Sequence, residues 1–109
     1  MDNLTTNKIV VLITTPSKEE AEKLGNHLVE SKLAACVNIV SGVLSIFFWE
    51  GKRCQESEAL LLIKTKKSLF QPLCEAVLKQ HPYSVPEIIA LPIVEGSPDY
   101  LQWVEDCTR

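Results

Sequence analysis

The sequence predicts an α+β fold with the element order βαββαβ and an additional C-terminal helix, and three observations lead to it. Runs of β-branched and apolar residues alternate with segments whose apolar residues repeat at helical spacing. The length of 109 residues fits a single domain over 1–109, with a polar, flexible tail at 1–7. Hydrophobic residues make up 46% and charged residues 23%, a globular composition that argues against a disordered chain.

The first strand and helix occupy the N-terminal third of the chain. Residues 8–15 (KIVVLITT) are apolar on both faces, which suits a central strand that is covered on both sides. Ser17 and Glu20 form a capping box, the signature of a helix start. Apolar residues at helical spacing follow, so we expect an amphipathic helix over 17–31.

A long hairpin comes next. Residues 33–40 (LAACVNIV) predict a second strand, which a bend or bulge at Ser41-Gly42 joins to the extended segment 43–49. The tight reversal at 50–52 then leads into a third strand over 54–65. We therefore expect these strands to be antiparallel neighbours.

The second half of the chain repeats the pattern of helix and then strand. An apolar stripe predicts a helix over 68–80, and two prolines stiffen the connector at 81–86. The strand predicted at 87–94 contains Pro92, which cannot donate a ladder hydrogen bond and so belongs at a sheet edge. A last helix begins at Pro98. This order is the ferredoxin-like arrangement, built on an antiparallel sheet.

The hairpin is too long for the domain that carries it. Residues 33–48, 16 in number, would span roughly 50 Å when extended, whereas a chain of this size is only about 35 Å across. Both faces of the arm are apolar, and an exposed patch of that kind is unusual in a monomer. We expect the arm to pack against sister chains, although it could instead curl back over its own helices. The residues expected at this contact are Leu44, Ile46, Phe47, Phe48 and Trp49.

Charge and motif content exclude several classes of protein. The net charge is −3 and no segment is rich in Lys or Arg, so neither nucleic acid nor an anionic membrane is an expected partner. No apolar run approaches the ~20 residues of a bilayer span, and the N-terminus does not resemble a signal peptide. We therefore expect a cytoplasmic protein with reduced cysteines. The sequence has no P-loop, GxSxG or GxGxxG motif, so we expect neither an enzyme nor an organic cofactor.

Two clusters carry candidate chemistry. In the first, near Trp49 and Lys52, Glu58 enters an apolar run, where a carboxylate needs a cation or a donor as partner. It either forms an ion pair, with Lys64 or with a lysine of another copy, or belongs to a ligand site. The second is the connector from His81 to Glu87, which forms either a structural corner or one wall of a polar pocket. Its imidazole, phenol and carboxylate, with Glu58, offer N and O donors to a divalent metal such as copper.

At these residues the chain resembles the CutA family of divalent-cation tolerance proteins. The resemblance runs from about residue 8 to residue 107. It is carried by LAACVNI at 33–39, FWEGK at 48–52, ESEALLLIKT at 56–65, HPYSVPEIIALP at 81–92 and YLQW at 100–103. It implies a homotrimer built by the long hairpins, a layout similar to that of the PII signalling proteins, and tolerance to divalent metals, copper in particular. No catalytic activity is implied.

Family motifs map onto individual residues of this chain. The resemblance implies an intersubunit cleft lined by Trp49, Lys52, Glu58, Lys64, His81, Tyr83 and Trp103. The metal ligands that we expect are Cys36, Glu58, His81 and Glu87. Some family members carry a cysteine in the first strand, but this chain has Ile13-Thr14-Thr15-Pro16 there. A site built from several cysteines is therefore not expected.

Two functions follow as hypotheses. The first is a trimeric copper tolerance protein that binds copper(II) or another divalent metal at intersubunit clefts. The alternative is a PII-like signalling or scaffold protein that binds a small-molecule effector or a partner protein without catalysis. Stoichiometric metal binding would favour the first, and stabilisation by a metabolite would favour the second.

Overall fold

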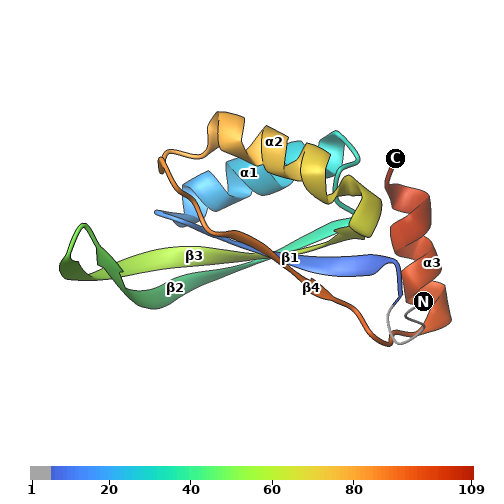
Figure 1. Cartoon of the computed structure of the whole chain (residues 1–109). Helices are drawn as coiled ribbons and strands as arrows, with labels where there is room; N and C mark the ends of the chain where they lie inside the picture. The colour runs from blue at the N-terminus through green and yellow to red at the C-terminus, as the bar shows by residue number, and fades with distance from the viewer. Residues whose placement is uncertain (1–5) are drawn as a thin grey trace.

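The computed structural model describes residues 6–109 and has the predicted α+β architecture (Figure 1). One antiparallel sheet has the strand order β2-β3-β1-β4, which places β1 inside the sheet and β4 at an edge, as predicted. In chain order the elements are β1 Lys8–Thr15, α1 Lys18–Glu30, β2 Cys36–Trp49, β3 Lys52–Lys66, the 3-10 turn η1 Lys67–Leu69, α2 Phe70–Gln80, β4 Ile88–Pro92 and α3 Pro98–Cys107.

Helices α1 and α2 cover one face of the sheet, and α3 lies at the end away from the hairpin (Figure 1). The core lies between these helices and the sheet and includes Val11, Ile13 and Leu61. The prediction that β1 is covered on both sides is wrong for a single chain, because within residues 6–109 no helix covers most of the opposite face, where Val10 and Leu12 are only half-buried. We call this surface the open face. Its apolar residues, placed by strand register, are Val10, Leu12, Leu60, Leu62, Ile89 and Leu91.

The helix starts follow the predicted caps. Ser17 Oγ accepts a 3.1 Å hydrogen bond from the backbone N–H of Glu20, so α1 begins one residue later. Ser97 Oγ accepts from the N–H of Tyr100, and Pro98 occupies the first turn of α3. Helix α2 begins at Phe70 rather than at residue 68, because η1 precedes it.

The hairpin forms one continuous pair of strands, with the bulge predicted in its first arm. The register shifts between Val40 and Val43, and Gly42 at this point has a φ of 73°. Glu50 and Gly51 make the two-residue turn, both with positive φ, as type I′ hairpin turns require. The arm does not curl back over the helices but projects past the end of β1, in a molecule 43 Å long (Figure 1).

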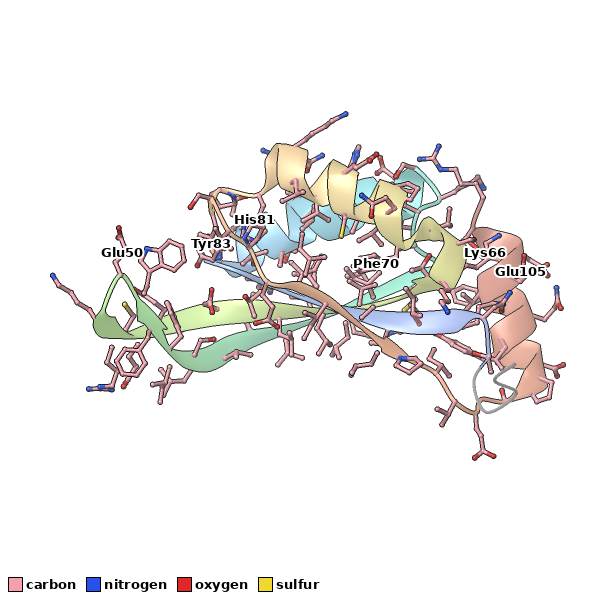
Figure 2. The ribbon with its side chains drawn as sticks, viewed as in Figure 1. Glu50, Lys66, Phe70, His81, Tyr83 and Glu105 are labelled. Atoms are coloured by element: carbon pink, nitrogen blue, oxygen red, sulfur yellow. The ribbon has the colours of Figure 1, made fainter. Side chains whose placement is uncertain are left out.

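Helix α3 is held to the sheet by one carboxylate. Glu105 forms ion pairs with the ammonium groups of Lys8, at 3.0 Å, and Lys66, at 3.2 Å, which lie opposite each other on β1 and β3 (Figure 2). These two hydrogen bonds hold the pKa of the Glu105 carboxyl below its ordinary value. Val104, on the same helix, is fully buried.

Only the last two residues of the tail predicted at 1–7 belong to the described part of the chain. Residues 1–5 lie outside the described residues, so the prediction is not tested there. Thr6 is anchored, since its backbone N–H and its hydroxyl both donate to the carbonyl of Ile93, at 2.9 and 2.8 Å. Within 6–109, none of the helices combines the length and apolar character of a membrane span.

Candidate functional site

The candidate site lies between the hairpin and the connector at 81–87. From the end of α2 the connector runs beside the part of β3 that extends beyond β1, and it carries His81 and Tyr83 toward the hairpin end marked by Glu50 (Figure 2). We call this region the hairpin–connector cleft. It comprises two adjoining hollows of about 560 and 350 Å³. The larger is lined by Pro16, Phe47, Trp49, Cys54, Glu56, Pro82, Tyr83, Ser84 and Val85. The smaller is lined by Thr14, Ser45, Ile46, Phe47, Trp49, Glu58, Tyr83, Val85 and Glu87.

A hydrogen bond between Tyr83 and Glu58 joins the connector to the hairpin. The phenol donates to Glu58 Oε2 at 2.8 Å, and the Glu58 side chain is only 7% exposed. The phenol is therefore the donor that the buried carboxylate needed. Burial, the hydrogen bond to Glu58 and the negative charge of Glu58 and Glu56 raise the pKa of Tyr83 to about 12. The phenol thus keeps its proton at physiological pH.

His81 uses both ring nitrogens within its own chain. Nε2 lies 2.7 Å from the carbonyl oxygen of Thr14, and Nδ1 accepts a 3.1 Å hydrogen bond from the backbone N–H of Tyr83. Because a carbonyl can only accept, Nε2 carries the proton and Nδ1 is the acceptor. The rings of His81 and Tyr83 are 4.8 Å apart. His81 therefore positions Tyr83, and neither nitrogen is free for a metal in this arrangement.

The structure separates the other predicted site residues. Cys36 faces Lys64 across β2 and β3, and six residues of β3, roughly 20 Å, separate this pair from Glu58. The Lys64 ammonium donates to Asn38 rather than pairing with Glu58. Trp103, on α3, stacks on Tyr100 with ring centroids 5.5 Å apart.

The remaining predicted residues lie at or near the cleft. Glu87 lines the smaller hollow, and Lys52 faces Trp49 beside the hairpin turn without lining either hollow. Sequence reasoning missed Pro16 and Val85, which also line the cleft. Val85 belongs to the stiff connector, but nothing in the pattern indicated which of its side chains turn inward.

The predicted hairpin contact divides between two faces of the arm. By register, Phe47 and Trp49 point to the same side as Glu58 and line the cleft. Leu44 and Phe48 point to the other side and are 59% and 77% exposed. Ile46 points to that side as well but still lines the smaller hollow, so alternation separates most but not all of these residues.

The described residues were also compared with the donor sets of metal sites. Among residues 6–109, no three His, Cys, Asp or Glu side chains converge as a metal site requires. The cysteines of this part of the chain are all unpaired.

Comparison with known proteins gives one consistent family. The model of the CutA1 divalent ion tolerance protein family matches residues 9–107. A relative from Arabidopsis thaliana, "Protein CutA, chloroplastic", is 53% identical over 105 residues, which are 96% of this chain and 58% of the relative. The "Divalent-cation tolerance protein CutA" of Thermus thermophilus is 52% identical over 99 residues, 91% of this chain and 96% of the relative. The chain thus spans little more than half of the plant relative.

Solved structures agree with the fold. CutA1 from Oryza sativa superposes with a TM-score of 0.93 at 48% identity, and the match covers 97% of both chains. The divalent cation tolerance protein from Thermus thermophilus superposes with a TM-score of 0.92 at 51% identity, covering 94% of this chain and 99% of that one. Both likenesses extend over nearly the whole domain.

Proposed function

This chain belongs to the CutA1 divalent ion tolerance family, and from that premise we propose that it acts in divalent-cation tolerance as a homotrimer without catalytic activity. We further propose that the hairpin–connector cleft is its ligand-binding region. The observation that carries the proposal is a projecting hairpin whose base, at Glu58, is bonded to the connector through Tyr83.

Exposed apolar surface supports the trimer. On the open face Ile89 and Leu91 are about half exposed, and on the hairpin Leu44 and Phe48 are more so. Burying a large apolar side chain contributes roughly 1.5–3 kcal/mol of favourable free energy. Burial of these two surfaces between chains would therefore strongly stabilise an oligomer. By register Phe47 and Trp49 lie on the same side of the sheet as the open face, so the cleft that they line adjoins the surface that sister chains would cover.

For the ion we propose copper(II) or a similar divalent metal, held between copies. Glu58 and Glu87 line the same hollow and supply carboxylate oxygens from one chain. Three donors do not converge among residues 6–109, so we place the further ligands on another copy, with Cys36 as the candidate thiolate. Copper accepts this mixture of donor types.

Equilibrium dialysis with copper(II) and zinc tests the metal proposal. We expect about one ion per chain in the wild type, and a loss of most of this binding in Glu58→Gln and Cys36→Ser. Glu30→Gln, on the exposed end of α1, is the matched control and should bind as the wild type does. A stoichiometry far below one ion per chain, unchanged by either variant, overturns the metal proposal.

The alternative function, a signalling module that senses a small molecule, is favoured by the size of the hollows. Cavities of 350 and 560 Å³ match the volumes of small-molecule sites. A bare metal ion needs no such space. The aromatic and acidic side chains that line the cleft indicate which class of small molecule it would bind.

A further inference from the structure

Three aromatic rings stand around the hairpin–connector cleft. Phe47 and Trp49 reach it from β2, and Tyr83 from the connector, and all three line both hollows. Phe47 and Trp49 remain 40% and 46% exposed, so their faces are accessible within the described chain. Aromatic faces carry negative partial charge, and a cation placed over one within about 6 Å is attracted to it.

The charged residues of the cleft have a single sign. Glu56 lines the larger hollow, while Glu58 and Glu87 line the smaller. Neither Lys nor Arg lines either hollow in the described part of the chain. Anion sites are usually built with cationic side chains, and within residues 6–109 the cleft offers none to a nucleotide, a phosphate or an organic acid.

Of these three carboxylates, Glu58 is the one that is buried and held in place by a hydrogen bond. More than nine-tenths of this residue is buried, and the phenol of Tyr83 satisfies Oε2. The structure records no hydrogen bond at Oε1, and no Lys or Arg of residues 6–109 forms an ion pair with the Glu58 carboxylate. Among the described residues every buried side-chain N or O atom has a partner, so the unpaired Oε1 is open to solvent rather than buried. A positively charged ligand in the adjoining hollow could therefore pair with this oxygen.

We propose that the hairpin–connector cleft binds an organic ammonium ion, a quaternary or alkylated amine held against Phe47, Trp49 and Tyr83 and neutralised by the carboxylates. The inference rests on the proposed function in one respect, that this cleft is the ligand-binding region. It names the ligand class for that cleft. The hollows are large enough for such an ion with a short polar tail.

Isothermal titration of the full-length protein with choline tests the inference. The matched probe is the uncharged alcohol in which carbon replaces the choline nitrogen, since it has the same shape without the charge. We expect saturable binding of choline and at least tenfold weaker binding of the alcohol. Equal affinity for the two probes, or binding of neither, overturns the proposal.

Variants then locate the site. Trp49→Leu removes an aromatic wall and Glu58→Gln removes the buried charge without changing the shape, and each should weaken choline binding at least about threefold. Tyr100→Leu replaces a similarly exposed aromatic outside the cleft and should bind as the wild type does. Unchanged binding in both cleft variants would place the ion elsewhere and overturn the assignment.

Failure of this inference is distinguishable from failure of the proposed function. A trimer that takes up copper but not choline would refute the ammonium site and leave metal tolerance standing. A single chain that binds choline but no metal would support the ammonium site and refute the proposed function.

Discussion

The phenol of Tyr83 donates a 2.8 Å hydrogen bond to Oε2 of Glu58, a residue 25 positions away in the sequence. This bond joins the connector between α2 and β4 to the base of the hairpin, next to Ala59, the last residue of β3 that pairs with β1. The projecting hairpin and the connector therefore stabilise each other's position. The cleft is the space that their contact defines.

Removing the phenol hydroxyl should destabilise the domain. Tyr83→Phe leaves Oε2 of the buried Glu58 without its donor, and hydrogen bonds to charged groups contribute about 1.5–3 kcal/mol. Because Tyr83 is itself 37% exposed, we expect a loss of about 1–2 kcal/mol in the free energy of unfolding, measured in urea. Adding Glu58→Gln to Tyr83→Phe should cost less than the sum of the single changes. Strict additivity would show that the two side chains do not interact.

The Tyr83 phenol should ionise only in strong alkali. Its pKa is raised from 10.0 to about 12 by burial first and then by Glu58. Since the folded state holds this proton more tightly than the unfolded chain does, the associated stability is complete below pH 10 and is lost as the pH rises toward 12. Absorbance titration of the tyrosinate, compared with Tyr83→Phe, isolates this group. Glu58→Gln should lower the midpoint, and a Tyr83 midpoint near 10 in the wild type would contradict the buried contact.

The fold was largely predictable because its signals are local. The capping serine at Ser17, the bulge glycine at Gly42 and the prolines of the last strand and helix each act on their own segment. The element order then allows few topologies. The side of the first strand that faces the helices was not predictable, because residues 9–13 are all apolar and their pattern does not separate Val11 and Ile13 from Val10 and Leu12.

The site was only partly predictable because it depends on distant contacts. The sequence indicated that Glu58 needs a partner, and the partners considered were Lys64 and a lysine of another copy. The structure supplies Tyr83 instead, a contact that depends on where the distant connector passes the hairpin. The apolar first strand was interpreted as covered on both sides. A run of apolar residues indicates that a surface is buried. It does not indicate whether the residues that bury it belong to the same chain or to another copy.

Acid should loosen α3. The folded-state pKa of Glu105 is lowered by hydrogen bonds to Lys8 and Lys66 from an ordinary value of 4.5. Its stabilising effect is therefore present above that value and is lost as the pH falls through the lowered folded-state pKa. We expect Glu105→Gln to melt below the wild type at neutral pH, with the difference shrinking as the pH falls below 4.5. A difference that is constant with pH would show that the ion pairs do not contribute.

Substitutions in the hairpin turn should change the free energy of unfolding according to how well the new residue tolerates a positive φ. Glu50 adopts a φ of 52°, which is unfavourable for most residues, whereas Asn-Gly is the preferred pair for this turn. Glu50→Asn should raise the free energy of unfolding by roughly 0.5–1 kcal/mol. Gly51→Ala, at a φ of 79°, should lower it by a similar amount or more. Thermal unfolding of both variants checks the pair, and a stabilising Gly51→Ala would contradict the turn geometry.

Association of the chain is the claim on which the trimer and the shared metal site depend. Light scattering coupled to size-exclusion chromatography, at micromolar concentration, measures it most directly. We expect a species of three times the 12.2 kDa chain mass, which Leu91→Lys on the open face and Phe48→Asp on the hairpin both shift toward smaller species. A stable species of one chain mass in the wild-type protein would contradict the account.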